Sequence, residues 1–118
     1  MRKGIGIVIA DDNQGVRETL KDILSEKGYF VEAVNNGYEL LNYLKKKSPD
    51  IVILDLMMPE KDGVETLSCI KTISPKSKII IYTGFQRYEN SIYAHTADKF
   101  LLKGNTIEDL LKAIEELS

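Results

Sequence analysis

The arrangement of apolar residues along the chain is the feature that most restricts how it can fold. Short, nearly continuous apolar runs occupy residues 5–10, 29–34, 51–54, 79–82 and 99–102. Such runs are typical of strands that are buried on both faces. Between the runs, apolar residues recur every three or four positions, which predicts helices over about 14–27, around 40–44, from 64 to before Pro75, over 88–96 and beyond 105. Alternating strands and helices indicate a parallel sheet covered by helices on both faces.

The fold class predicted from this alternation is α/β, a doubly wound sheet of five parallel strands. Right-handed crossovers leave few topologies, and we expect the flavodoxin-like strand order 2-1-3-4-5, a three-layer (βα)5 sandwich. A chain of 118 residues is close to the usual size of one domain, so residues 1–118 are expected to form a single domain.

Two helix ends carry clear sequence signals. Gly28 is a natural residue to end the first helix, because glycine readily adopts the left-handed backbone conformation found there. The last helix is expected to begin after Asn105 as its cap, with Glu108 completing a capping box.

Composition excludes several classes of protein. The 16 basic and 18 acidic residues give a net charge of −2, which argues against direct nucleic-acid binding by this domain. Cys69 is the single cysteine, so the chain has no internal disulfide framework and no CxxC metal site. No apolar run approaches the roughly 20 residues of a membrane span, and the N-terminus does not resemble a signal peptide. We therefore expect a cytoplasmic domain with no membrane partner.

Polar residues stand where the predicted strands end. Asp11 and Asp12 follow the first strand, Asp55 the third, Thr83 the fourth and Lys103 the fifth. In open α/β sheets the carboxyl ends of the strands form the ligand-binding edge. Neighbouring strands lie about 4.8 Å apart. The strands next to that of Asp55 carry short side chains, and the more distant strand carries the long lysine, so the reach of each side chain matches its distance from Asp55. These side chains are therefore predicted to converge on Asp55.

Three converging carboxylates repel one another by about 3 kcal/mol per pair at a separation near 5 Å and an effective dielectric constant near 20. Such a cluster needs a cation, and oxygen ligands favour a hard one, Mg²⁺ or Mn²⁺. A metal, a carboxylate nucleophile, a hydroxyl group and a lysine together suit phosphoryl transfer onto an aspartate.

These residues, in this order, resemble the receiver (CheY-like) domains of two-component response regulators. The resemblance covers about residues 4–117. The elements that carry it are Asp11-Asp12, Asp55-Leu56-Met57-Met58-Pro59, Gly63, Thr83-Gly84 and Lys103.

The resemblance implies that Asp55 accepts a phosphoryl group from a sensor histidine kinase or a histidine phosphotransfer protein. It implies that Asp12, Asp55 and the backbone carbonyl of Met57 bind Mg²⁺, and that Asp11 acts largely through water. Such a domain catalyses its own phosphorylation and dephosphorylation and does not turn over a separate substrate.

Further roles follow from the same resemblance. Thr83, the Gly84 backbone and Lys103 would contact the phosphoryl group, and Phe100 would turn inward when the domain is activated. The face formed by the fourth helix, fifth strand and fifth helix would then change its affinity for a downstream protein or an appended output domain. Met57 and Phe85 would obstruct the attacking water and prolong the phosphorylated state.

The sequence departs from the family pattern at three places. Phe100 has no hydroxyl group, so any inward turn would depend on burial alone. Gly104 replaces the usual proline after the lysine, which predicts a looser loop around Lys103. The segment 94–97 replaces a turn that usually contains glycine, so the end of the fourth helix is not fixed by the pattern.

Other functions are less compatible with these residues. A flavodoxin-type FMN carrier needs a Ser/Thr/Gly-rich phosphate loop where Asp11 and Asp12 stand. An aspartyl phosphohydrolase normally carries a second aspartate at the position of Met57. A receiver-like interaction module that is not phosphorylated in the cell stays open as an alternative. The end of the chain at Ser118 is compatible with a stand-alone receiver and with a piece of a longer regulator.

Overall fold

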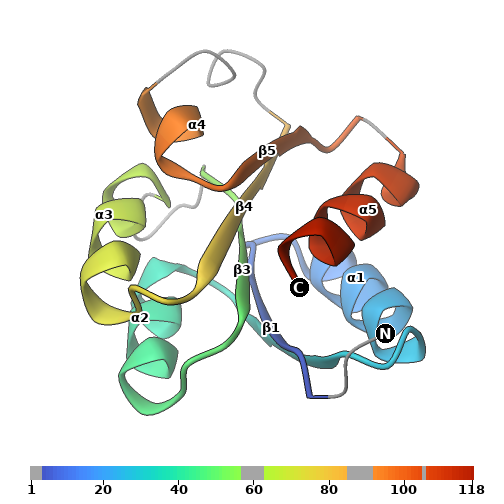
Figure 1. Cartoon of the computed structure of the whole chain (residues 1–118), viewed down its shortest axis with the longest axis horizontal. Coiled ribbons are helices and arrows are strands. Elements are labelled where there is room, and N and C mark those ends of the chain that lie inside the picture. The colour runs from blue at the N-terminus through green and yellow to red at the C-terminus, as the bar shows by residue number, and fades with distance from the viewer. Residues whose placement is uncertain (1–3, 57–62, 85–91, 105) are drawn as a thin grey trace.

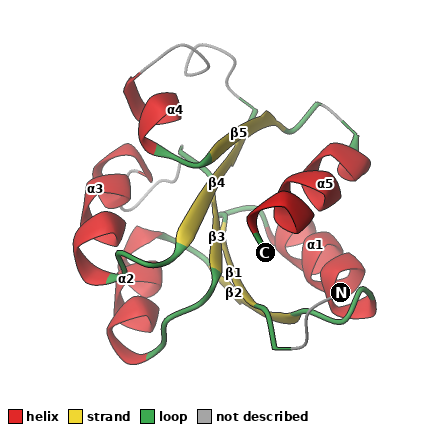
Figure 2. Cartoon of the chain, viewed as in Figure 1, coloured by secondary structure: helices red, strands yellow, loops and turns green. Residues whose placement is uncertain are grey.

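A parallel sheet of five strands runs through the middle of the protein, with helices on both sides (Figures 1 and 2). The computed structural model describes residues 4–56, 63–84, 92–104 and 106–118. The strands are β1 (Gly6–Ala10), β2 (Phe30–Val34), β3 (Ile51–Leu54), β4 (Lys78–Thr83) and β5 (Lys99–Leu102). The helices are α1 (Gln14–Glu26), α2 (Gly37–Lys46), α3 (Gly63–Ile73), α4 (Ile92–Thr96) and α5 (Ile107–Leu117). The strand order is β2-β1-β3-β4-β5, which confirms the predicted topology.

Each face of the sheet packs against its own set of helices. Side chains alternate between the faces along each strand, so on β3 Ile51 and Ile53 join one core and Val52 and Leu54 join the other. The first core includes residues of α1 and α5, and the second includes residues of α2 and α3. Figure 2 shows these helices on opposite sides of the strands. Both faces being buried explains why the central strands are apolar without interruption.

The strand register brings the ends of the central strands level with one another. Ala10 at the end of β1 is the partner of Leu54 at the end of β3. The N–H of the next residue, Asp55, donates to the Ala10 carbonyl at 3.0 Å. Where β4 and β5 end, the Lys103 N–H donates to the Thr83 carbonyl at 2.9 Å. The residues that follow the strands are thus held at one edge by backbone hydrogen bonds.

Side-chain caps set the starts of α1 and α2. The Asn13 side chain accepts a hydrogen bond from the Val16 N–H at 3.0 Å, and the Asn36 side chain accepts one from the Glu39 N–H at 2.9 Å. These bonds satisfy N–H groups that the first turn of a helix leaves without backbone partners. Gly28 has a φ of 96°, so its predicted role in ending α1 is confirmed.

The predicted capping box of the last helix is wrong by one residue. The N-cap of α5 is Thr106, and the Thr106 side chain makes no capping hydrogen bond. Asn105 lies outside the described residues. The apolar stripe fixes the rotational phase of α5 against the sheet through Leu110, Ala113 and Ile114, which are buried, but it does not fix the residue at which the first turn begins.

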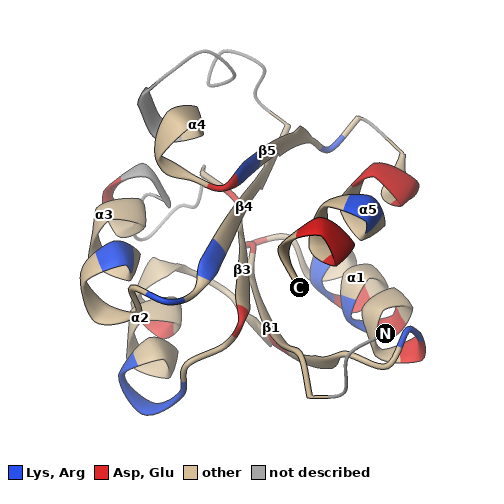
Figure 3. Ribbon diagram, in the orientation of Figure 1, with Lys and Arg blue, Asp and Glu red and all other residues tan. Residues whose placement is uncertain are grey.

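Charged residues lie mainly on the helices and at the ends of strands (Figure 3). On β1, β3 and β4 the one charged residue is Lys78, at the start of β4. Charges that appear at the carboxyl edge therefore stand out from an apolar sheet. Within the described ranges, no helix is both long and apolar enough to cross a membrane.

Candidate functional site

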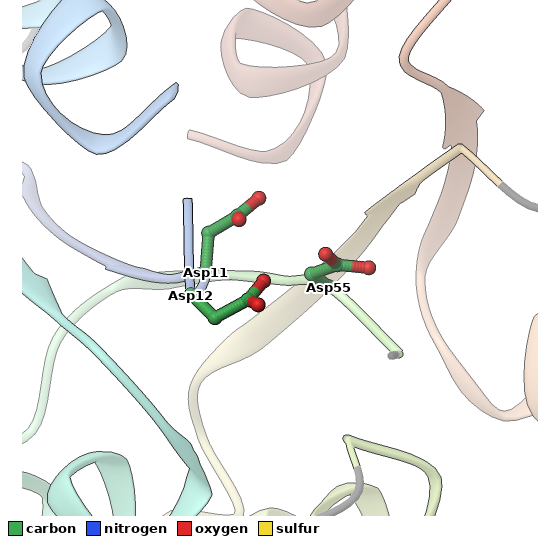
Figure 4. Close-up of side chains that lie close together, drawn as sticks. All are labelled: Asp11, Asp12 and Asp55. Atoms are coloured by element: carbon green, nitrogen blue, oxygen red, sulfur yellow. The ribbon is translucent and has the colours of Figure 1, made fainter. Parts of the chain in front are cut away.

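Three aspartates meet at the carboxyl edge of the sheet. Asp11 and Asp12 follow β1, Asp55 follows β3, and the three side chains lie close together in Figure 4. One carboxylate oxygen from each residue lies within 4.8 Å of the other two. The convergence comes directly from the parallel pairing of β1 with β3, because it places the residues after both strands side by side.

The three carboxylates differ in their exposure to solvent. Asp11 is 2% exposed and Asp55 is 5% exposed, whereas Asp12 is exposed. The Asp11 carboxylate accepts a hydrogen bond from the Asn13 N–H at 2.9 Å. Buried carboxylates are costly unless they are paired with charges or hydrogen-bond donors, so the cluster needs positive charge close by.

Lys103 supplies that charge from the end of β5. Its Nζ atom lies 2.6 Å from Asp11 Oδ2 and 3.1 Å from Asp55 Oδ2. The approach to Asp55 was expected from the strand order, but the shorter contact with Asp11 was not. Burial lowers the pKa of Lys103, but the hydrogen bond that Lys103 donates to Asp11 and the negative charges of Asp55 and Asp11 outweigh burial, so its pKa is raised overall. Lys103 therefore remains an ammonium ion around neutral pH.

Gly104 does not leave the backbone at Lys103 unsupported. The Lys103 N–H bond to Thr83 continues the pairing of β4 with β5 by one residue. A side chain at Gly104 would meet no other atom within 4 Å, so the position is open. The ladder hydrogen bond, and not the residue after it, holds the start of this loop.

The predicted switch residues lie in different surroundings. Thr83 is fully buried at the end of β4, and the adjacent Gly84 is exposed. Phe100 is half-buried on β5 and packs against the core on the α2 and α3 side. Met57 and Phe85 lie outside the described residues, so the roles predicted for them stay predictions.

The donor set fits a hard divalent cation. Mg²⁺ binds oxygen ligands at about 2.1 Å, so two oxygens bound directly to one ion lie at most about 4.2 Å apart. The carboxylate oxygens lie within 4.8 Å of one another, which is close enough for the cluster to hold one cation directly or through water. The cluster contains no nitrogen or sulfur ligand among the described residues, which favours Mg²⁺ or Mn²⁺ over softer metals.

Sequence reasoning missed a groove beside this site. The groove has a volume of about 500 Å³ and includes residues of α1 together with Tyr82, Lys103 and Ile107. Burial raises the pKa of Tyr82, Lys103 opposes that shift and Asp11 adds to it, which places this phenol in the same electrostatic environment as the site. Its position, immediately before Thr83 on a buried strand, could have indicated that it lies next to the carboxyl edge.

Sequence reasoning also missed Arg17. Its Nη1 atom donates to the Asp11 backbone carbonyl at 2.8 Å and to Asn35 Oδ1 at 3.0 Å. No sequence signal pointed to these bonds, because an arginine in the first turns of an amphipathic helix is usually a surface residue.

Comparisons with known proteins agree with this geometry. A family model described as the response regulator receiver domain matches residues 7–115. Response regulator MprA of Mycobacterium leprae (strain TN) is 34% identical over 113 residues, which make up 94% of this chain and 50% of that protein. The chain thus spans about half the length of the MprA relatives that it matches.

Two solved structures are similar over nearly the whole chain. The crystal structure of response regulator TrrA from Thermotoga maritima in complex with Mg²⁺-BeF has a TM-score of 0.90 and 31% identity, and the match covers 99% of this chain and 100% of that one. The crystal structure of histidine kinase ThkA in complex with TrrA gives a TM-score of 0.87 and 31% identity, with 98% of each chain covered. With the family model matching most of its length, this chain belongs to the response regulator receiver domain family.

Proposed function

We propose that the chain is a signalling switch in which Asp55 accepts a phosphoryl group from a phosphohistidine. The donor would be a sensor histidine kinase or a histidine phosphotransfer protein. The observation that carries the proposal is the position of Lys103, whose ammonium group lies 3.1 Å from Asp55 within a cluster of three carboxylates. The TrrA neighbours, one with Mg²⁺-BeF and one with a histidine kinase, support the same assignment.

The chemistry at Asp55 is a single transfer. A carboxylate oxygen of Asp55 attacks phosphorus, an O–P bond forms, and the P–N bond to the partner's imidazole breaks with its electron pair staying on nitrogen. Asp12, Asp55 and the Met57 carbonyl would hold Mg²⁺, which neutralises charge on the phosphoryl oxygens when bound. Asp11 would act on the metal through water.

Lys103 and Thr83 would receive the phosphoryl group. The Lys103 ammonium would pair with a phosphoryl oxygen, and the Thr83 hydroxyl and the Gly84 N–H would donate hydrogen bonds to others. Before phosphorylation Lys103 pairs with Asp11 and Asp55, so it already stands at the place where new negative charge would arrive. The site would therefore need little rearrangement to stabilise the transferred group.

The signal would leave the site through β5. Movement of Thr83 toward the phosphoryl group and inward rotation of Phe100 would alter the face formed by α4, β5 and α5. Phe100 is half-buried and has no hydroxyl group, so burial alone would favour its inward position. A downstream protein or an attached output domain would read this change as a shift between two populations.

Phosphorylation by acetyl phosphate tests the proposal without a partner kinase. Wild-type protein is expected to give a shifted band on a Phos-tag gel when acetyl phosphate and Mg²⁺ are both present. Asp55→Asn, or wild type in EDTA, should give no shift. An unshifted wild-type band would contradict the proposal and favour an interaction module that is not phosphorylated.

The lifetime of the phosphorylated state is a separate part of the proposal. Met57 and Phe85 stand two residues after Asp55 and Thr83, and both side chains are bulky and apolar. They would keep the attacking water away from the acyl phosphate. Changing both, Met57→Asn with Phe85→Glu, should shorten the dephosphorylation half-life, and an unchanged half-life would refute this role.

A further inference from the structure

Arg17 joins the loop that carries Asp11 and Asp12 to the loop after β2. Its Nη1 atom carries two hydrogens, and it donates to both the Asp11 carbonyl at 2.8 Å and Asn35 Oδ1 at 3.0 Å. Asp11 belongs to the loop after β1, and Asn35 belongs to the loop after β2, 18 residues beyond Arg17 in the chain. We call these three groups the Arg17 clamp.

The far end of the clamp is itself fixed. The Asn35 N–H donates to Glu39 Oε1 at 2.6 Å, within the first turn of α2. The next residue, Asn36, is buried and caps the same helix by accepting from the Glu39 N–H. Asn35 therefore offers Arg17 an acceptor that is attached to a helix start and not to a free loop.

The near end of the clamp acts on the peptide bond between Asp11 and Asp12. Because a peptide unit is planar, fixing the Asp11 carbonyl fixes the orientation of the bond that leads into Asp12. Asp11 is buried and held by Asn13 and Lys103, but Asp12 is exposed. The direction of the Asp12 carboxylate therefore depends on its backbone, which the clamp holds.

We infer that Arg17 is a positioning residue that orients the Asp12 carboxylate toward the divalent cation through the Asp11 carbonyl. The inference deepens the proposed function and rests on it for the role of Asp12 as a metal ligand. It also predicts the direction in which the loss of Arg17 changes the affinity for the metal. A positive charge close to a metal site repels a cation, so on charge alone the loss of Arg17 would strengthen metal binding. If positioning dominates, the loss of Arg17 weakens it.

Direct binding of Mn²⁺, measured through the electron paramagnetic resonance signal of the free ion, separates the charge effect of Arg17 from its positioning effect. Arg17→Met keeps much of the aliphatic stem and removes the donors, and is expected to weaken Mn²⁺ binding roughly tenfold, the lower end for groups that orient metal ligands. Arg17→Lys keeps the charge but cannot reproduce the planar donor, so it should weaken binding as well. Asn35→Ala should weaken it less, because the bond to the Asp11 carbonyl survives.

Lys47→Met is the matched control. It also removes a cation that joins a helix end to β2, through a 3.4 Å contact with Glu32, but that contact lies at the other end of α2. Mn²⁺ affinity should stay within about twofold of wild type, as for surface changes away from a site. Arg17→Met protein that binds Mn²⁺ as tightly as wild type, or more tightly, would overturn the inference.

Two further measurements keep the outcomes apart. In metal-free protein, the Asn13 amide should exchange with solvent faster in Arg17→Met, because the loop that it anchors has lost its clamp. With acetyl phosphate, Arg17→Met should need roughly tenfold more Mg²⁺ for half-maximal phosphorylation and keep its rate at saturating Mg²⁺.

Wild type that binds Mn²⁺ but is never phosphorylated would refute the proposed function alone. Normal wild-type phosphorylation with an unchanged metal requirement in Arg17→Met would refute the clamp alone.

Discussion

Among its individual residues, the site carries more negative charge than one lysine neutralises. Three carboxylates face one ammonium group, and the two buried carboxylates are the ones that Lys103 contacts. Asp12 is the exposed member, and it adds negative charge that a metal would offset. Repulsion among the carboxylates should therefore lower the free energy of unfolding of the metal-free protein.

Replacing Asp12 tests this balance. Asp12→Asn removes one carboxylate from the cluster and should raise the free energy of unfolding in EDTA by about 1 kcal/mol, since solvent screens much of the repulsion at an exposed group. The same change should abolish the stabilisation that Mg²⁺ gives to wild type. Urea denaturation with and without Mg²⁺ measures both effects. Asp22→Asn, on the exposed surface of α1, is the control and should change stability by less than about 0.5 kcal/mol.

Lys103 predicts a distinct dependence of stability on pH. Its pKa in the folded protein is raised above 10.5, so its contribution is fully present below about pH 10.5 and is lost as the pH rises through the folded-state pKa. In EDTA, Lys103→Met should lower the free energy of unfolding by about 2 kcal/mol near neutral pH, because it leaves buried carboxylates unpaired.

The difference in unfolding free energy between wild type and Lys103→Met should stay constant from pH 7 to 9 and shrink at higher pH. Tyrosines that titrate in the same range are present in both proteins, so their effect cancels in the difference except at Tyr82, whose pKa Lys103 lowers. Adding Tyr82→Phe to both proteins removes this exception. A difference that grows above the ordinary lysine pKa would contradict the pairing of Lys103 with Asp11 and Asp55.

At the scale of elements, helix starts position the loops that carry the site. Asn13 caps α1 directly after the Asp11-Asp12 pair, and Asn36 caps α2 directly after the Asn35 end of the Arg17 clamp. Both caps therefore hold loops at the carboxyl edge of the sheet. The start of α5 differs, since its N-cap residue, Thr106, makes no side-chain capping bond.

The two kinds of helix start should respond differently to alanine. Asn36→Ala removes a buried side-chain cap and is expected to lower the free energy of unfolding by about 1 kcal/mol. Thr106→Ala should lower it by less than about 0.5 kcal/mol, because the Thr106 side chain makes no capping bond. Equal losses in urea denaturation would show that side-chain capping is not what stabilises the start of α2.

Much of the architecture could be predicted from the sequence because it depends on local pattern. Apolar runs located the strands, and the polar residues after them located the edge of the sheet where Asp11, Asp12 and Asp55 meet. The residue at which α5 begins could not be predicted, because Asn105 and Thr106 are both good caps and only the packed helix selects between them.

Contacts between distant loops were beyond the sequence pattern. The approach of Lys103 to Asp11 depends on how a flexible side chain that starts after β5 reaches past the ends of β4 and β3. The Arg17 clamp depends on the spacing between two loops that only the folded sheet brings together. The roles of Met57 and Phe85 remain predictions from the family resemblance.

At the scale of the whole molecule, one sheet serves two cores. Ile53 on β3 belongs to the core under α1 and α5, and Ile81 on β4 belongs to the core under α2 and α3. Both side chains are essentially inaccessible to solvent. Because the strands are shared, the loss of one core removes the support of the other, so the two cores should unfold together.

Ile53→Val and Ile81→Val form a matched pair that tests this coupling. Each removes one buried methylene group and should lower the free energy of unfolding by about 0.5–1.5 kcal/mol. In both variants, unfolding curves from circular dichroism and from tyrosine fluorescence should coincide. Separate transitions in either variant would mean that the two helical layers unfold independently.

Locating the phosphoryl group chemically tests the role of Asp55 most sharply. Borohydride reduces an acyl phosphate and converts the modified aspartate to homoserine, which peptide mass spectrometry can place in the sequence. After treatment with acetyl phosphate and Mg²⁺, we expect homoserine at position 55 and at no other aspartate, and none in EDTA. Homoserine at Asp11 or Asp12, or unmodified Asp55 in fully folded protein, would contradict the assignment of this site.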